Sequence, residues 1–270
     1  MNVTSKTMLN AGVGFPMKRS LGVMLHNEIY KKEHINATML AFEEKSIKKF
    51  ISTVRATPIH LSPVTAPHKQ AVMPLLDAID QAAREIGAVN TIINRDGKLT
   101  GFNTDLDGIA ASLNELRLSG KKILVLGAGG VAQPLAYYLK LRDVHFYCLN
   151  RGKARAKALT KKFGGTALTK KQLNQHSFDV IINATTLGMS PKEKRTPIDA
   201  KHIKRGALVF DIVYRPLETR LLREAKKRGA RTINGLKMFV AQALAQDSLW
   251  LRKKIRDRDY EKFLKKQIKN

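Results

Sequence analysis

The sequence predicts an α/β protein of two domains, one of them built on a doubly wound parallel sheet. Its 270 residues correspond to about 1.8 domains at roughly 150 residues per domain. Between residues 121 and 234, short apolar runs alternate with helical stretches, which is the pattern of βαβ units. A glycine-rich turn joins the first of these runs to the first helix. Together these observations favour a Rossmann-type fold for the middle of the chain.

The first hundred residues predict a separate, smaller α/β unit. We expect helices over residues 44–54 and 69–86, and a strand over 59–64. Residues 90–94 and 98–103 predict a hairpin, because Asp96-Gly97 between them suits a two-residue turn.

The middle of the chain predicts the larger sheet. The expected strands are residues 121–126, 144–149, 178–184, 207–213 and 231–234, and the expected helices are 130–140, 153–163 and 217–228. Pro134 is tolerable in the first of these helices because it lies near the first turn. Residues 238–270 predict two helices. We therefore expect one domain from residues 1–104 plus 238–270, and a second from residues 105–237.

Composition excludes several classes of protein. Hydrophobic residues make up 43% and charged residues 26%, which is typical of a globular chain. Cys148 is the only cysteine, so an internal disulfide is excluded. The longest uncharged run, residues 123–139, is short and interrupted by glycine and proline, so no membrane span is expected. The first eleven residues do not read as a signal peptide, so we expect a cytoplasmic protein. No His/Cys cluster has ligand spacing, so no metal is expected.

The charge balance is strongly basic. Lys and Arg number 49 against 22 Asp and Glu, a formal net charge of +27. Such a chain attracts phosphate backbones, so a basic nucleic-acid-binding protein is a remote alternative function. Aromatic residues are only 6% and are not interleaved with the basic clusters as stacking platforms would be. We therefore expect no specific nucleic-acid partner.

The glycine-rich turn has the features of a dinucleotide-binding site. Gly127-Ala128-Gly129-Gly130-Val131-Ala132 fits G-x-G-x-x-G/A and lies between a predicted strand and a predicted helix. Gly127 permits a tight turn, and Gly129 lets the backbone approach a pyrophosphate at the helix N-terminus.

The end of the next predicted strand favours NADP over NAD. An NAD site usually has an acidic residue there, which accepts a hydrogen bond from the ribose. This chain instead has Asn150-Arg151-Gly152-Lys153-Ala154-Arg155, with three cations and no carboxylate. We expect Arg151 to bind a 2′-phosphate, assisted by Lys153 or Arg155, because a guanidinium suits phosphate. Lys153 and Arg155 could equally belong to a solvated helix face.

An enzyme that reduces a carbonyl with a nicotinamide needs a proton donor beside the oxygen. Lys69, which follows Pro67-His68, and Asp105, which follows Asn103-Thr104, are candidates for such a donor and its partner. Their spacing does not by itself establish the pairing.

Many segments, in collinear order, resemble the shikimate dehydrogenase family, including its quinate/shikimate and shikimate-dehydrogenase-like branches. They are Ser20-Leu21 with His26-Asn27, residues 64–69, 87–91, 103–105, 127–130, 150–151 and 183–189, Asp211 to Tyr214 with Pro216 to Thr219, and Gly235-Leu236 with Gln242-Ala243. The probability that so many motifs match in this order by chance is negligible.

The resemblance implies reversible, NADP-linked reduction of 3-dehydroshikimate to shikimate, a step of chorismate and aromatic amino-acid biosynthesis. It implies that Lys69 is the catalytic acid/base and Asp105 its partner. The implied substrate contacts are Ser20, Thr65, Asn90, Tyr214 and Gln242. The implied cofactor-binding residues are Gly127, Ala128, Gly129, Gly130, Val131, Asn150, Arg151, Arg155, Ile212 and Gly235. A monomer or a homodimer is expected.

Two departures from the family pattern concern the substrate. The family's second carboxylate-binding serine stands here as Gly22, and an asparagine near the site stands as Pro63. A hydrogen bond to a charged group contributes about 1.5–3 kcal/mol, so these changes bear on substrate identity. They leave open an enzyme of the shikimate-dehydrogenase-like branch that acts on quinate or a related polyhydroxy cyclohexane carboxylate. A binding protein that has lost catalysis is a further alternative, which the presence of both Lys69 and Asp105 disfavours.

Overall fold

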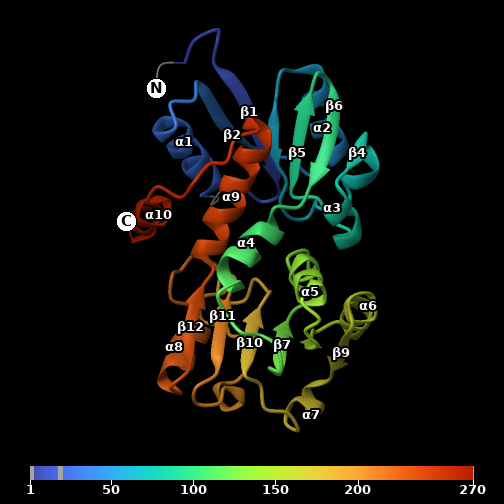
Figure 1. Ribbon diagram of the computed structural model, residues 1–270, viewed down its shortest axis with the longest axis vertical. Coiled ribbons are helices and arrows are strands. Elements are labelled where there is room, and N and C mark those ends of the chain that lie inside the picture. Colours follow the sequence, from blue (N-terminus) through green and yellow to red (C-terminus); the bar gives the residue numbers. More distant parts are fainter. Residues whose placement is uncertain (1–2, 18–20, 270) are drawn as a thin grey trace. The chain divides into compact units, whose positions relative to one another are not determined.

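The computed structural model describes residues 3–17 and 21–269. The chain divides into two compact units, one of residues 1–107 and 240–264, the other of residues 108–239 and 265–270. Figure 1 labels the helices and strands of both units.

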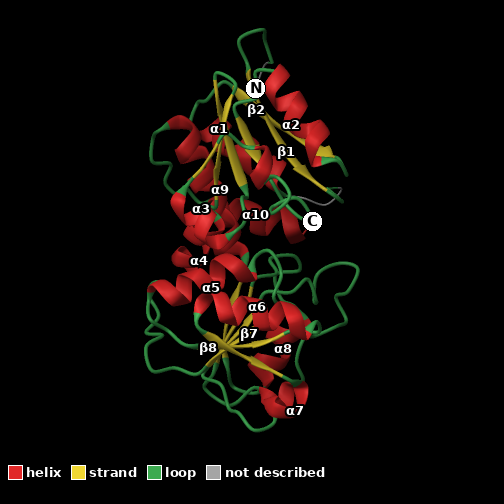
Figure 2. Ribbon diagram, turned by 90° about the vertical axis from the view of Figure 1, so that its right-hand side faces the viewer, coloured by secondary structure: helices red, strands yellow, loops and turns green. Residues whose placement is uncertain are grey.

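The second unit is built on a six-stranded, wholly parallel sheet with the strand order β12-β11-β10-β7-β8-β9. The strands are β7 (Ile123–Leu126), β8 (Phe146–Leu149), β9 (Gly165–Leu168), β10 (Val180–Asn183), β11 (Leu208–Asp211) and β12 (Arg231–Asn234). Helices α5 (Ala132–Leu141), α6 (Lys153–Phe163), α7 (Lys170–Leu173) and α8 (Arg220–Lys227) connect them, with a 3₁₀ turn at Ala200–His202. Figure 2 shows the strands at the centre of this unit among the helices. The strand order is that of the doubly wound dinucleotide-binding fold, which confirms the predicted fold class.

Burial explains why these segments form strands. All four residues of β7 and all four of β10 are buried, as expected where helices cover both faces of a parallel sheet. Leu124, Ile181 and Val209 from three neighbouring strands pack with Leu221 and Leu222 of α8 in one apolar core. Because strand order reverses between β7 and β10, the carboxyl ends of these strands form the point where such folds bind ligands.

The first unit contains two smaller sheets. In one, β1 (Met8–Gly14) and β2 (Ala37–Glu43) are parallel, joined by α1 (Gly22–Lys32). In the other, the order is β3 (Leu61–Pro63), β5 (Thr91–Arg95), β6 (Lys98–Phe102) and β4 (Ala78–Ile79). Parallel bridges from Leu9 to Ile59 and from Val13 to Val64 tie β1 to the second sheet. Helices α2 (Ile47–Ala56) and α3 (Gln81–Ile86) and a 3₁₀ turn at Met73–Leu75 complete the segments between strands.

Three helices contain the boundaries between the units. They are α4 (Asp105–Leu113), α9 (Leu236–Leu251) and α10 (Tyr260–Lys269). The predicted hairpin around Asp96-Gly97 is confirmed by β5 and β6, and the two helices predicted over residues 238–270 are confirmed by α9 and α10. The helix predicted over 153–163 forms with those bounds.

The helix predicted over residues 69–86 is wrong. Residues 66–72 form consecutive turns, and only residues 81–86 are α-helical. Pro74 lacks an N–H, and the side chain of Asp80 accepts hydrogen bonds from the backbone of Ala82 and Ala83, so a new helix begins there. Lys69 therefore lies in a turn and not at the start of a long helix.

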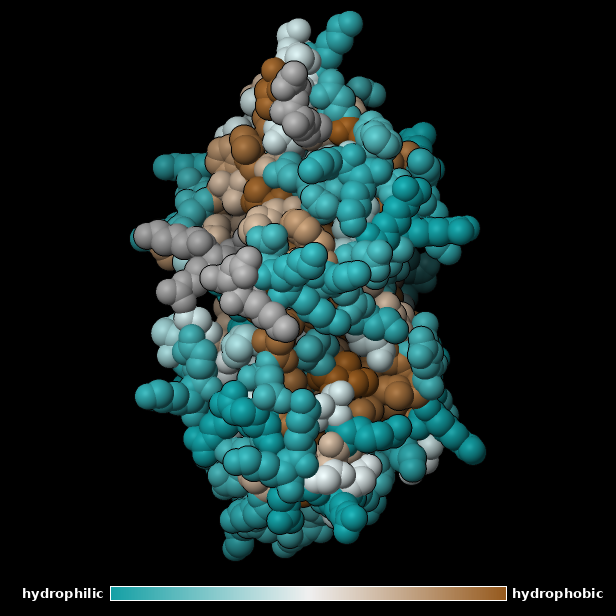
Figure 3. Space-filling view, turned by 90° about the vertical axis from the view of Figure 1, so that its left-hand side faces the viewer, coloured by the Kyte–Doolittle hydropathy of each residue, from teal (hydrophilic) through white to brown (hydrophobic). Residues whose placement is uncertain are grey.

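No helix within residues 3–17 and 21–269 is long and apolar enough to cross a membrane. The face of the molecule in Figure 3 is covered mainly by hydrophilic side chains, in keeping with the 49 Lys and Arg residues of the chain.

Candidate active site

The turn after β7 is shaped for a phosphate group. Gly127 has φ 105°, and a Cβ at this position would lie 2.7 Å from Thr185 Cγ2 and 3.1 Å from the Ala184 carbonyl oxygen. Only glycine fits these two conditions without strain. A Cβ on Gly129, by contrast, would meet nothing within 4 Å, so its backbone faces open space at the beginning of α5. An anion can approach the N–H groups there.

The predicted cation cluster lies beside this turn. Leu126 and Leu149 are paired in register, so β7 and β8 end together. After β8, the side chain of Asn150 donates to the Gly152 carbonyl at 2.9 Å and shapes the loop. Arg151 and Arg155 are exposed. Both guanidinium groups are therefore accessible to a phosphate at the end of β8.

The ends of β10 and β11 carry a buried polar network. Asn183 donates to Asp211 Oδ1 at 2.9 Å, and Thr219 donates to Asp211 Oδ2 at 2.6 Å. Burial raises the pKa of Asp211 to about 6 despite these hydrogen bonds. Asn183 also accepts from Thr185, which fixes the loop that packs on Gly127.

The loops after β11 and β12 meet at Ile212 and Gly235. A side chain on Gly235 would overlap the Ile212 carbonyl, so the two backbones are in contact. The ring of Tyr214 stacks on Phe239 with centroids 4.1 Å apart, and burial raises the pKa of the Tyr214 phenol to about 12. The Tyr214 hydroxyl is thus a neutral hydrogen-bonding group at ordinary pH.

Lys69 and Asp105 form a direct pair in the first unit. Lys69 Nζ lies 2.5 Å from Asp105 Oδ2, and the two side chains are 17% and 9% exposed. The Lys69 carbonyl also accepts from Val89 N at 2.8 Å, which fixes the turn against the strand that follows. A charged amine held this way, partly open to solvent, can give a proton to a bound molecule and take one back.

Asn90 holds the other oxygen of Asp105. Asn90 Nδ2 donates to Asp105 Oδ1 at 3.0 Å and to Thr104 Oγ1 at 3.1 Å. Asn90 Oδ1 accepts from Thr104 N at 2.8 Å and from Thr91 Oγ1 at 2.7 Å. The geometry therefore brings together three predicted site residues, Lys69, Asn90 and Asp105.

The other residues implied to contact the substrate differ in exposure. Thr65 has an exposed side chain, and its backbone N–H donates to Val13 O at 2.9 Å. Gln242 is half-buried on α9. Gly22 begins α1, and Pro63 is the last residue of β3. Ser20 lies outside the described residues.

Sequence reasoning missed three residues of this site. Thr91 and Thr104 lie within the family-like segments but were not assigned a role, and both hydrogen-bond to Asn90 Oδ1. The third residue is Gln246, whose Nε2 donates to the Asn90 carbonyl at 3.2 Å and to Thr91 Oγ1 at 3.0 Å. The helical spacing of four between Gln242 and Gln246 is a signal that could have pointed to Gln246. No group of three metal-ligating side chains occurs in the part of the chain that is described.

A doubly wound sheet with an open glycine turn, in a chain that also has a lysine–carboxylate pair, is typical of oxidoreductases that use a nicotinamide dinucleotide. Comparison with known proteins makes the class specific. Residues 13–92 match the shikimate dehydrogenase substrate binding domain, and residues 109–226 match the shikimate / quinate 5-dehydrogenase domain. The chain belongs to the shikimate dehydrogenase family.

Individual relatives agree with this assignment. A shikimate dehydrogenase (NADP(+)) of Thermococcus kodakarensis is 41% identical over 253 residues, covering 91% of this chain and 92% of that protein. A crystal structure of a shikimate dehydrogenase in complex with NADP+ has a TM-score of 0.91 at 33% identity, covering 99% and 98% of the two chains. The Thermus thermophilus shikimate 5-dehydrogenase, in complex with NADP(H) and shikimate, has a TM-score of 0.88 at 29% identity, covering 97% and 100%.

Proposed function

We propose that this protein catalyses the reversible, NADP-dependent reduction of 3-dehydroshikimate to shikimate, a step of aromatic amino-acid biosynthesis. The observation that carries the proposal is the Lys69–Asp105 pair at 2.5 Å, held by Asn90 in the unit that contains the matched substrate binding domain. The curated relatives that match the chain over most of its length have the same activity in their names.

Lys69 supplies the proton. When bound, NADPH supplies the hydride that reaches the ring carbonyl carbon. The Lys69 Nζ donates a proton to the carbonyl oxygen as negative charge develops on it, and accepts that proton in the reverse direction. Asp105 holds the ammonium group through Oδ2, while Asn90 holds Oδ1, so the pair keeps one orientation. A fixed donor contributes because its geometry needs no rearrangement at the moment of transfer.

Substrate binding is assigned to five polar side chains. The proposed contacts are Ser20, Thr65, Asn90, Tyr214 and Gln242. Residues 1–107 and 240–264 would form the substrate domain, and residues 108–239 the NADP domain. Asparagine, glutamine and threonine can each hydrogen-bond a hydroxylated ring, and such groups reject analogues that lack the hydroxyl.

Cofactor binding is assigned to the second unit. The backbone of Gly127 to Val131 would bind the pyrophosphate, because the space beside Gly129 is open. The proposed contacts of the adenosine portion and its 2′-phosphate are Asn150, Arg151 and Arg155. Ile212 and Gly235, whose backbones touch, are the remaining proposed cofactor contacts.

The quinate alternative is not favoured, because the curated relatives are named shikimate dehydrogenase (NADP(+)). Initial rates of absorbance change at 340 nm, measured with shikimate and with quinate, each with NADP⁺ and NAD⁺ at 150 mM salt, test the proposal. Rapid turnover of shikimate with NADP⁺ is the expected result. Turnover of quinate without turnover of shikimate would overturn it and would implicate the altered positions Gly22 and Pro63.

Compartment and assembly are part of the proposal. We expect a cytoplasmic enzyme that acts as a monomer or homodimer without a nucleic-acid partner. Light scattering of the purified protein at 150 mM salt tests the oligomeric state, and a tetramer or larger species would contradict it.

A further inference from the structure

A continuous series of hydrogen bonds connects the Lys69–Asp105 pair to helix α1 and strand β1 of the first unit. It passes through Gln246 and Asp247 on α9 and through His26 and Tyr30 on α1, and none of these four side chains is more than 2% exposed. We propose that Gln246, oriented by the His26–Asp247 pair, is a positioning residue for Lys69 and Asp105. This proposal rests on the proposed function.

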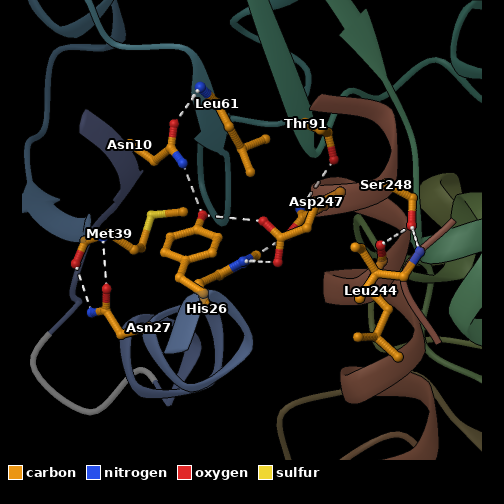
Figure 4. A network of polar contacts seen from close by, with 12 residues as sticks. Asn10, His26, Asn27, Met39, Leu61, Thr91, Leu244, Asp247 and Ser248 are labelled. Atoms are coloured by element: carbon orange, nitrogen blue, oxygen red, sulfur yellow. Dashed lines mark hydrogen bonds and ion pairs between the residues drawn. The ribbon is translucent and has the colours of Figure 1, made fainter. Parts of the chain in front are cut away.

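One end of the series is fixed by a backbone N–H. Leu61 N donates to Asn10 Oδ1 at 2.9 Å, so Asn10 Nδ2 must face Tyr30, to whose hydroxyl it donates at 2.9 Å. The Tyr30 hydroxyl then donates to Asp247 Oδ1 at 3.1 Å. Figure 4 shows Asn10 beside Leu61 and His26 beside Asp247. Burial and the neighbouring Asp247 raise the pKa of Tyr30 well above its usual value, so the phenol keeps the proton that it donates.

The other end is fixed by a backbone carbonyl. Gln246 Nε2 donates to Asn90 O at 3.2 Å and to Thr91 Oγ1 at 3.0 Å. A flipped amide would set Gln246 Oε1 against the Asn90 carbonyl, two acceptors facing each other with no proton between them. The amide orientation is therefore determined, and Gln246 Oε1 faces His26 Nε2 at 3.2 Å.

His26 joins the two ends. Its Nε2 must carry a proton, because Gln246 Oε1 can only accept. Its Nδ1 lies 2.9 Å from Asp247 Oδ2, the carboxylate oxygen that does not accept from Tyr30. The Asp247 contact at Nδ1 fixes the plane of the imidazole, and Nε2 donates toward Gln246. The imidazole therefore locks the glutamine amide in the one orientation that supports Asn90.

The locked amide acts on the catalytic pair through two neighbouring residues. Thr91 Oγ1, which accepts from Gln246, donates to Asn90 Oδ1 at 2.7 Å. Asn90 is thus held at its carbonyl and at its side-chain oxygen, and its Nδ2 donates to Asp105 Oδ1 at 3.0 Å. Gln246 touches neither Lys69 nor the reacting atoms in this scheme. Its role is to fix the orientation of Asp105.

Three variants on α9 test the proposal with shikimate and NADP⁺. Gln246→Met keeps the size of the side chain and removes all its hydrogen bonds, and Gln246→Glu keeps the acceptor facing His26 and removes the donors. We expect both to lower kcat by on the order of tenfold or more, with the KM for NADP⁺ within about twofold, as for a misplaced catalytic group. Full kcat in Gln246→Glu would overturn the hydrogen-bond direction, and full kcat in both would overturn the positioning role.

Ser248→Ala is the matched control. Ser248 lies two residues from Gln246 on α9, donates to Leu244 O at 2.6 Å and accepts from Ile255 N at 2.9 Å, so its removal also breaks half-buried hydrogen bonds. We expect its kcat to stay within about twofold of that of the unmodified protein. A loss of kcat equal to that of Gln246→Met would mean that the effect is structural.

Nuclear magnetic resonance separates this inference from the reaction itself. The ¹⁵N signals of His26 should show a protonated Nε2, and the ¹³Cγ signal of Asp105 should move in Gln246→Met but not in Ser248→Ala. Neither measurement needs substrate, so an unmodified protein inactive on shikimate would overturn the proposed function and leave these readouts intact. An unprotonated Nε2, or an Asp105 signal that does not move, would overturn the inference.

Discussion

Lys69 and Asp105 are 36 positions apart in the sequence, yet the ammonium nitrogen of one lies 2.5 Å from the carboxylate of the other. The antiparallel strands β5 and β6 bring the residues that precede Asp105 back beside residues 91–95. The Lys69 carbonyl accepts a hydrogen bond from Val89 N, which holds the turn that contains Lys69 next to the start of β5. The pair is therefore a product of the fold and not of local sequence. Its chemical role follows from that placement.

Removal of the amine should abolish proton transfer while the fold is retained. We expect Lys69→Ala to lower kcat by about 10²-fold or more, the scale of general acid–base catalysis. Circular dichroism should show unchanged secondary structure. Lys98→Ala, which removes an exposed lysine of the same unit, is the control and should turn over normally. Retained turnover in Lys69→Ala would exclude the lysine from the reaction.

Arg151 should discriminate between the two dinucleotides. Because only NADP has a 2′-phosphate, Arg151→Ala should weaken binding of NADP far more than binding of NAD. Calorimetric titration with each cofactor measures the difference. Lys161→Ala, an exposed cation in the last turn of α6, controls for loss of general positive charge. An equal loss for both cofactors would show that Arg151 does not contact the 2′-phosphate.

Two glycines of the same turn should respond differently to alanine. Gly127→Ala forces an L-residue to φ 105° and drives Cβ against Thr185, so both stability and cofactor binding should fall. Gly129→Ala places its methyl in open space, so the melting temperature should change little while NADP binding weakens. Thermal denaturation with and without NADP⁺ measures both effects. Normal NADP binding by Gly129→Ala would show that the pyrophosphate does not bind at this turn.

The raised pKa of Asp211 makes stability depend on pH. The folded-state pKa of about 6 exceeds the ordinary aspartate value of about 3.9, so the folded protein binds the proton more tightly. The stabilisation is complete below about pH 4 and is lost as pH rises through 6. Asp211→Asn has no such group, so its stability relative to the unmodified protein should rise by about 2 kcal/mol from pH 4.5 to 7.5. Urea denaturation at several pH values measures the free energy of unfolding of both proteins. A difference between the two proteins that stays constant from pH 4.5 to 7.5 would contradict the assignment.

Five of the six strands of the larger sheet could be predicted from sequence because their signals are local, whereas β9, whose residues GTAL do not form an apolar run, was not predicted. Each buried strand is a short apolar run, and Gly152 and Gly164 bound α6 at its predicted ends. The N-terminal elements β1, α1 and β2 were not predicted. The residues of β1, MLNAGVG, mix small, polar and apolar side chains, and its partner β2 is exposed over residues 40–43, so neither shows clear alternation.

The candidate site could be predicted only in part for the same reason. Lys69, Asn90 and Asp105 were found because they lie in motifs that resemble a known family. The contact between His26 and Asp247 joins residues 221 positions apart, and no periodicity in the sequence points to it. Buried polar partners of this kind emerge only when the tertiary fold is known.

The division of the first unit has a consequence for synthesis on the ribosome. Residues 108–239 emerge as one uninterrupted stretch that contains the whole six-stranded sheet, so this part can begin to fold early. Residues 1–107 are made first, but Asn10, His26 and Tyr30 cannot complete their hydrogen-bond series before Asp247 is translated. The N-terminal segment therefore completes its folding last. A nascent chain arrested before residue 240 would expose it to proteases and chaperones.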